Sequence, residues 1–450
     1  MLYYLSDWLV PYFGPFNVLT YNTVRAGGAA FTAFVLCVLA GPFVIEQLRR
    51  LKFGQYIKRE HVADLHALHQ RKAGTPTMGG VLLVGASVLA LLLWGDLGNR
   101  LLWVAMLALL TMGVVGFLDD YLKILNKHND GLSARAKLIG QVTLGLLLGA
   151  YLYWQPVTLG DALIVEDDVR DWGAFSAVLA RGEAEEAPAA LHTLWRALPV
   201  DQREVLRRGT PEPGTERRLL LDALNAALQD PALFSAQAWA AAPLDREGAR
   251  LLARGAALPR EVARLNRLTL AQDVPGGVLK TTRGLHSKLG VPGLKEVFIP
   301  LGVLYVLFVV GIITATSNAV NVTDGLDGLA AGTASISVLA FTGIAYVVSR
   351  ADWSSYLFLV YVPGATEVFV FGAALLGAGL GFLWFNAHPA EVFMGDTGSL
   401  ALGGAIGTMA LLTKQELLLP IVAGLFVIEA GSVMLQVGSY KLTGKRIFRM

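Results

Sequence analysis

The stretch NAVNVTDGLDG, residues 318–328, lies between two apolar runs at 296–317 and 328–348. Each run is long enough for a transmembrane helix, which needs about 20 apolar residues. Two Asn and two Asp side chains therefore stand where one predicted span ends and the next begins. Carboxylates held close together beside the low dielectric of a bilayer repel each other and need a counter-charge, so this stretch indicates a functional site at the membrane surface.

The composition supports a membrane protein. Of the 450 residues, 54% are hydrophobic and 16% are charged, whereas soluble domains are about 45–50% apolar and about 25% charged. The apolar runs predict nine spans, at 24–45, 78–95, 101–118, 138–155, 296–317, 328–348, 367–385, 399–413 and 417–439. The expected fold is therefore an all-α polytopic integral membrane protein. The short run at 399–413 requires burial among other helices.

The first predicted span contains the single cysteine, Cys37, so no disulfide within the chain is possible. This run has no basic start region and no small-residue cleavage site, and we expect a retained helix instead of a signal peptide. Basic residues concentrate in three connections, at 49–72, 123–137 and 441–449. Because cytoplasmic loops carry the excess of Lys and Arg, these connections are predicted to be cytoplasmic and the N-terminus to lie outside.

Residues 156–285 differ from the rest, since they are rich in Ala, Arg, Glu and Asp with amphipathic stretches such as ALHTLWRALP at 190–199. Alternation of the spans places them outside. The predicted organisation is a membrane domain at 1–155, an extracytoplasmic helical insertion at 156–285 and a membrane domain at 286–450. The insertion carries no recognisable catalytic or metal motif. It is interpreted as an accessory domain for an envelope partner, with a role in substrate contact as the alternative.

Four polar motifs fall on the predicted cytoplasmic side: RKAGTPTMGG (71–80), GFLDDYLK (116–123), NAVNVTDGLDG (318–328) and NAHPAEVFMGDTGS (386–399). Three of them contribute carboxylates, namely Asp119, Asp120, Asp324, Asp327 and Asp396. Taken singly, Asp324 and Asp396 could cap the helices that follow them. The adjacent acids at the end of the third span are harder to explain, because they oppose the helix macrodipole.

Five carboxylates gathered on one face beside a low-dielectric bilayer need a counter-charge, and a hard cation such as Mg²⁺ supplies it. Mg²⁺ leaves coordination positions to phosphate oxygens, which indicates phosphate chemistry. Lys72, Lys123 and Lys127 could bind phosphate or anchor helices at the interface. Phe393 could stack on a base or simply pack. No nucleic-acid partner is expected.

These motifs, read as LDDYLK, NAVNVTDGLDGLA and FMGDTGSLALGG with RKAGTPTMGG ahead of them, resemble the phospho-N-acetylmuramoyl-pentapeptide transferase family. It lies within the polyprenyl-phosphate N-acetylhexosamine-1-phosphate transferase superfamily. The likeness covers roughly 20–155 and 285–450. It implies Mg²⁺-dependent transfer of phospho-MurNAc-pentapeptide from UDP-MurNAc-pentapeptide to undecaprenyl phosphate, giving lipid I and UMP for peptidoglycan biosynthesis. It also implies an active site at the inner face of the bacterial cytoplasmic membrane, and a homodimer.

The resemblance also assigns roles by motif. Asp396 would bind Mg²⁺ together with Asp119, and Asp119 would be the base or nucleophile, with Asp120 beside it. Lys123 and Lys127 would hold phosphate, and Phe393 would stack on uracil. The nucleoside and sugar side would be lined by Lys72, Thr77, Asn321, Asp324, Asp327 and Asn386.

The chain departs from the family in two respects. It stops at KRIFRM, where the family continues into a His-rich loop and a tenth span, so either the chain is truncated or that part of the site is lost. Its insertion at 156–285 is longer than the usual loop. Two alternatives stay open: a sister transferase that uses UDP-GlcNAc, and an ion-coupled transporter. A transporter would place its acids at mid-membrane depth in two repeated halves.

Overall fold

The computed structural model describes residues 1–9, 12–50, 75–125, 131–155, 157, 163–165, 172–184, 186–187, 189–229, 279–281, 287–294, 297–357, 359–360, 362, 364–445 and 447. Contacts divide the chain into two compact units. The membrane unit comprises residues 1–158 and 286–450, and the insertion unit comprises residues 159–285.

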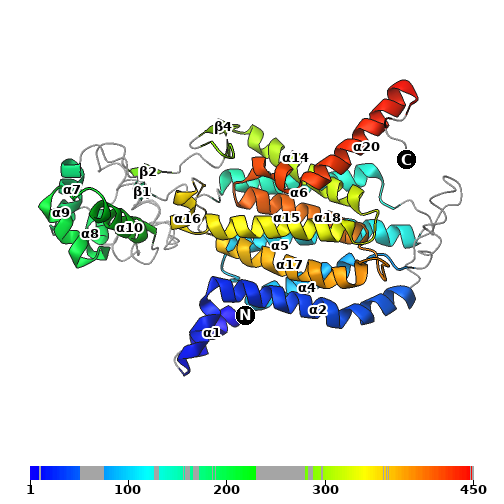
Figure 1. The fold of residues 1–450 in the computed structure, drawn as a ribbon, viewed down its shortest axis with the longest axis horizontal. Helices are drawn as coiled ribbons and strands as arrows, with labels where there is room; N and C mark the ends of the chain where they lie inside the picture. Colours follow the sequence, from blue (N-terminus) through cyan, green and yellow to red (C-terminus); the bar gives the residue numbers. More distant parts are fainter. Residues whose placement is uncertain are drawn as a thin grey trace, which may run out of the picture. The chain divides into compact units, whose positions relative to one another are not determined.

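Helices make up most of the membrane unit. They are α1 (Leu2–Leu9), η1 (Gly14–Thr20), α2 (Asn22–Arg50), α4 (Gly80–Trp94), α5 (Arg100–Leu125), α6 (Ala134–Trp154), α14 (Leu304–Thr323), α15 (Leu329–Val348), α16 (Ala351–Tyr356), α17 (Ala365–Asn386), α18 (Gly395–Leu412), η5 (Glu416–Leu418), α19 (Leu419–Val422) and α20 (Gly424–Thr443). Helices α2, α5, α15, α17 and α18 run alongside one another, whereas α20 projects at an angle (Figure 1). Strands β3 (Lys288–Gly290) and β4 (Phe298–Pro300) form an antiparallel hairpin before α14.

Six described helices are long and apolar enough to cross a membrane: α2, α5, α6, α14, α15 and α17. A seventh crossing is possible if the segment Glu416–Val422 and α20, bent by 80° at their junction, form one span. The prediction of a helical polytopic membrane protein is confirmed, but the described helices supply six or seven clear spans instead of nine. Every predicted span overlaps a helix. However, α4 has only 15 residues, and a polar first turn dilutes the apolar character of α18.

Helix α18 is the most enclosed element of the membrane unit. All of its residues from Thr397 to Leu412 are buried, and it contacts α4, α5, α14 and α15. A helix covered on all sides needs no continuous apolar surface for lipid, which explains how its Gly-rich sequence persists. The burial predicted for the run at 399–413 is thus observed. The helix also begins four residues earlier than that run, so Asp396 belongs to its first turn.

The predicted span at 296–317 is wrong in its boundaries. Residues Phe298–Pro300 form strand β4, and Gly302 has a φ of +55°, so the helix starts only at Leu304. Helix α14 then continues through the polar stretch to Thr323, with Asp324 as its C-terminal cap residue. The next helix starts at Leu329 after Gly328. The interpretation of Asp324 as the cap of that following helix is therefore wrong.

A buried ion pair joins α2 to α17 at the end of α17 opposite Asn386. Two nitrogens of the Arg25 guanidinium each lie 2.7 Å from an oxygen of Glu367, and both side chains are 3% exposed. Arg25 Nε also donates to the carbonyl of Trp94 at the end of α4 (2.9 Å). Three helices thus meet at one charged contact.

Breaking this pair from one side is expected to destabilise the protein. Glu367→Gln leaves a buried guanidinium without its counter-charge, which costs about 3–5 kcal/mol. Thermal unfolding in detergent should show a clear fall in Tm, and the paired change Arg25→Met with Glu367→Leu should restore much of it. A Tm for Glu367→Gln equal to that of the unmodified chain would contradict this prediction.

The insertion unit is mainly helical in its described part, with α7 (Trp172–Ala180), η3 (Arg181–Glu183), α8 (Ala189–Ala197), α9 (Val200–Arg208) and α10 (Thr215–Gln229). These helices enclose an apolar core of their own, which includes Phe175, Trp195 and Leu224. Strand β1 (Leu163–Val165) pairs antiparallel with β2 (Leu279–Thr281), so the two ends of the unit meet. Adjacent ends allow a domain to be inserted without separating the flanking helices.

Candidate active site

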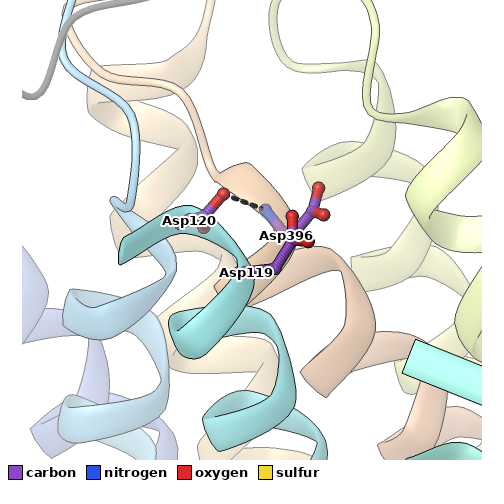
Figure 2. Close-up of side chains that lie close together, drawn as sticks. All are labelled: Asp119, Asp120 and Asp396. Atoms are coloured by element: carbon purple, nitrogen blue, oxygen red, sulfur yellow. Dashed lines mark hydrogen bonds between the residues drawn. The ribbon is translucent and has the colours of Figure 1, made fainter. Parts of the chain in front are cut away.

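Three acidic side chains converge where α5 ends and α18 begins (Figure 2). Asp119, Asp120 and Asp396 each offer one oxygen, and these oxygens lie within 4.8 Å of one another. The carboxylates of Asp119 and Asp120 are 0% and 4% exposed, and that of Asp396 is 16% exposed. The structure thus brings together the acids that sequence reasoning selected from two distant motifs. We call these three residues the acidic cluster.

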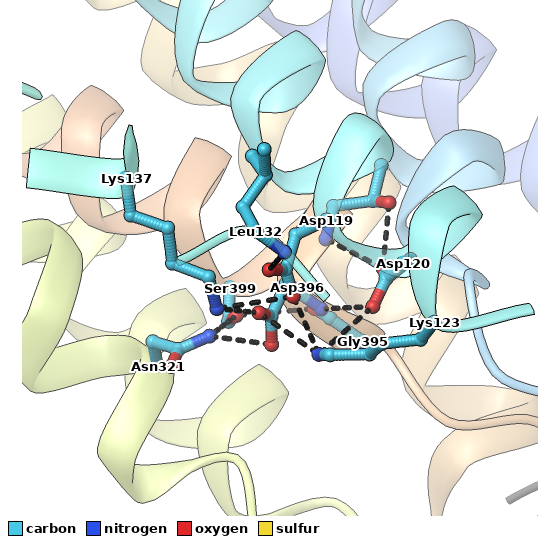
Figure 3. A network of polar contacts seen from close by, with 10 residues as sticks. Asp119, Asp120, Lys123, Leu132, Lys137, Asn321, Gly395, Asp396 and Ser399 are labelled. Carbon is cyan, nitrogen blue, oxygen red and sulfur yellow. Dashed lines mark hydrogen bonds and ion pairs between the residues drawn. The ribbon is translucent and has the colours of Figure 1, made fainter. Parts of the chain in front are cut away.

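Two lysines supply the counter-charge (Figure 3). The ammonium of Lys123, on α5, lies 2.5 Å from Asp119 Oδ2 and 3.1 Å from Asp396 Oδ2. The ammonium of Lys137, on α6, lies 3.0 Å from Asp119 Oδ2 and 2.5 Å from Asp396 Oδ2. The two cations and two carboxylates alternate, so each Lys contacts both Asp119 and Asp396.

Sequence reasoning missed Lys137 as a site residue. It counted this lysine only among the basic residues of a cytoplasmic connection. A signal was available: helix α6 is capped by Ser133, which places Lys137 in its first turn. A cation there opposes the helix macrodipole, as the acids at the end of α5 do. The ion pair between Lys137 on α6 and Asp119 on α5 offsets both unfavourable placements.

Two asparagines of the stretch 318–328 connect helix α14 to α18 and to α6. On α14, Asn321 Nδ2 donates to Asp396 Oδ1 and to Ser399 Oγ, each at 2.9 Å, so it orients one side of the Asp396 carboxylate. One turn earlier, Asn318 Nδ2 donates to Gln141 Oε1 on α6 (2.9 Å). The polar face of α14 therefore packs against polar partners rather than lipid.

Of the two other predicted acids, Asp324 interacts electrostatically with this centre, whereas Asp327 contacts the loop that carries His388. Burial, together with the nearby carboxylates of Asp396 and Asp120, raises the pKa of Asp324 to about 7. Asp327 has a side chain that is 5% exposed, and its Oδ2 lies 2.8 Å from Nδ1 of the exposed His388. His388, which was not predicted as a site residue, thus links two of the polar loops.

The predicted nucleoside side is held together by backbone and amide contacts. The side chain of Asn386 is buried: its Oδ1 accepts from the Gly328 amide (3.2 Å), and its Nδ2 donates to the Val392 carbonyl (2.9 Å). Half-buried Phe393 follows, with its amide donating to the Pro76 carbonyl and its carbonyl accepting from Gly79 (both 2.9 Å).

Thr77 lies between Pro76 and Gly79, whose backbones bond to that of Phe393, and it is half-buried. The segment around it therefore approaches the loop that carries Phe393, which joins the first and last of the four polar motifs. Lys72 and Lys127 lie outside the described residues.

The acidic cluster could bind a metal ion. Its donors are all carboxylate oxygens, the ligand type that Mg²⁺ prefers, and Mg²⁺ is usually held by only one or two of them. Asp119 and Asp396 fit this requirement, because their Oδ2 atoms face the shared space between the lysines.

Two family models and several known proteins match this chain. Residues 274–414 match Glycosyl transferase family 4, and residues 72–84 match phospho-N-acetylmuramoyl-pentapeptide-transferase signature 1. A phospho-N-acetylmuramoyl-pentapeptide-transferase of Methylacidiphilum infernorum is 37% identical over 452 residues, covering 100% of this chain and 89% of the relative. A protein of the same name from Acidobacterium capsulatum is 38% identical over 454 residues, covering 100% of this chain and 90% of the relative. The chain therefore belongs to the phospho-N-acetylmuramoyl-pentapeptide-transferase family of membrane enzymes.

Proposed function

We propose that the chain transfers phospho-MurNAc-pentapeptide from UDP-MurNAc-pentapeptide to undecaprenyl phosphate, releasing UMP and forming lipid I. The observation that carries the proposal is the alternating array of Asp119, Asp396, Lys123 and Lys137 at the ends of apolar helices. A site at that depth can receive a soluble nucleotide sugar and the phosphate of a lipid. Family membership supports the choice of donor and acceptor.

In the proposed reaction an oxygen of the acceptor phosphate attacks the β-phosphorus of the donor, and the bond to the bridging oxygen breaks so that UMP leaves. Mg²⁺, when held by Asp119 and Asp396, supplies neutralisation of charge on the diphosphate. Lys123 and Lys137, now paired with both carboxylates, then contact phosphate oxygens. Such transfer depends mainly on positioning and on charge stabilisation.

Asp119 has two possible roles. It can keep the acceptor phosphate ionised during a direct transfer, or it can attack the β-phosphorus first and form a phosphorylated enzyme. We assign either role to Oδ2, because it faces the two lysines while Oδ1 accepts a hydrogen bond from the Leu132 amide (2.7 Å). A single-turnover experiment separates the roles: stoichiometric UMP release without acceptor supports the covalent route, and its absence supports direct transfer.

We also infer that the site faces the cytoplasm. Its residues share one end of the membrane unit, at the C-termini of α5, α14 and α17 and the N-terminus of α18. The C-terminal ends of α2 and α20, with Arg49 and Lys441, carry the basic residues expected on the cytoplasmic side. If α4, α18 and the bent α19–α20 segment also cross, the membrane unit has nine crossings. The insertion then follows the fourth crossing, and with the N-terminus outside it would lie outside as well.

The proposed function is tested with the purified chain in detergent, undecaprenyl phosphate and each of two donors. UMP release from UDP-MurNAc-pentapeptide, lost with EDTA and restored by Mg²⁺, is the expected result. Release from UDP-GlcNAc alone would show the sister activity instead. Absence of UMP with both donors would overturn the proposal.

Asn386→Ala is expected to weaken use of the donor without unfolding the protein. It leaves the half-buried Gly328 amide and the buried Val392 carbonyl without their partner, which loosens the two loops that Asn386 joins. We expect kcat/KM for the donor to fall by about 5- to 150-fold, which corresponds to the about 1–3 kcal/mol that such a loss costs. Glu391→Gln, at an exposed position in the same loop, is the matched control. Equal kcat/KM values for the two variants would contradict the prediction.

A further inference from the structure

We propose that Asp120 is a positioning residue, which caps the N-terminus of α18 from the neighbouring helix α5 and so aims Asp396 at the reaction centre. Asp120 would then bind neither metal nor phosphate. The inference rests on the proposed function for its kinetic readouts, but its structural basis is independent of it.

The carboxylate of Asp120 is already occupied by α18. Its Oδ1 accepts from the amide of Asp396 (3.3 Å), and its Oδ2 accepts from the amide (2.9 Å) and the hydroxyl (2.8 Å) of Thr397. Figure 2 shows the Asp120 side chain turned to the main chain of Asp396. The first amides of a helix lack partners within it, and the cap residue of α18, Met394, supplies no side-chain bond. Asp120 fills that role from α5.

The backbones around this cap are shaped for it. Gly116 lies one turn before Asp120 on the same face of α5. A Cβ at Gly116 would lie 2.1 Å from the carbonyl oxygen of Asp396, so only glycine allows this approach. Gly395 has a φ of +71°, and a Cβ there would lie 2.7 Å from Asp120 Oδ2. Gly116 thus lets the first turn of α18 approach α5 closely, and Asp120 caps that turn.

The adjacent acids on α5 consequently have different tasks. Residues next to each other on a helix point about 100° apart. Asp119 therefore faces the lysines while Asp120 faces α18, although Lys123 Nζ also lies 3.6 Å from Asp120 Oδ1. A free helix N-terminus attracts phosphate, but this one already holds a carboxylate. The phosphates of the substrates are then left to Lys123 and Lys137.

The test compares Asp120→Asn with Asp120→Ala. Asparagine keeps an acceptor oxygen for the α18 amides but loses the negative charge that makes a carboxylate a strong ligand for a divalent cation. We expect Asp120→Asn to keep kcat within about tenfold of the unmodified chain, the loss being confined to weaker hydrogen bonds. We expect Asp120→Ala to lower kcat by about 100-fold with a smaller change in donor KM, because misplaced reacting groups cost about that much.

Two further measurements do not depend on turnover. Mn²⁺ binding to the detergent-purified protein, followed by electron paramagnetic resonance, should be unchanged in Asp120→Asn and weakened in Asp120→Ala. Gly116→Ala, which leaves the carboxylate intact, should lower kcat and Mn²⁺ affinity as Asp120→Ala does.

The proposal is overturned if Asp120→Asn is as inactive as Asp120→Ala and binds Mn²⁺ equally weakly. That result would make Asp120 a ligand or a reacting group. If the unmodified chain released no UMP, the proposed function would fail instead. The Mn²⁺ affinities of the three variants would still decide whether Asp120 caps α18.

Discussion

Asp396→Asn is expected to abolish Mg²⁺-dependent UMP release, lowering kcat by at least about 1,000-fold, at the upper end of what removing one charge-stabilising group costs. Asp396 is the carboxylate that contacts Lys123, Lys137 and Asn321 together. A neutral amide in its place is a much weaker ligand for a divalent cation than a carboxylate, and its NH₂ group would face two ammonium groups.

Initial rates of UMP release with and without Mg²⁺ measure this effect. Thermal unfolding should show that the variant is folded, and Asp222→Asn, at an exposed position of the insertion unit, is the matched control with unchanged rates. Near-normal turnover by the Asp396 variant would refute the assignment of the acidic cluster as the reaction centre.

Lys137→Met is expected to lower kcat/KM for the donor by about 10- to 150-fold, the cost of one hydrogen bond to a charged group. Without bound metal it also removes one of two cations between Asp119 and Asp396, so the two carboxylates repel each other more strongly. The variant should therefore gain more Tm on addition of Mg²⁺ than the unmodified chain does.

Arg135→Met is the matched control, since Arg135 lies two residues away on α6 but is exposed. It should leave kcat/KM and the Mg²⁺-dependent shift in Tm unchanged, and Lys137→Arg should recover part of the activity. If Lys137→Met and Arg135→Met behaved alike, Lys137 would have no role at the site.

The sequence by itself determined the class of fold and predicted which acidic residues make up the candidate site. Apolar runs of about 20 residues require helices in lipid, because only a helix satisfies its own backbone there. The polar motifs indicated Asp119 and Asp396, since carboxylates at helix ends beside a bilayer need a counter-charge, and the family resemblance added Asn321. These inferences use local composition, and local composition can be read directly from a sequence.

Only the tertiary structure decided which partner each polar side chain contacts. The partners of Asp120 are 276 and 277 positions away on α18, and Lys137 meets Asp396 across 259 positions. No local pattern separates Asp119 from Asp120, because their difference arises from which helix each one faces. The boundaries of α14 also depended on pairing between β3 and β4 and on packing against α6 and α18. Such contacts between distant segments exist only once the helices have packed.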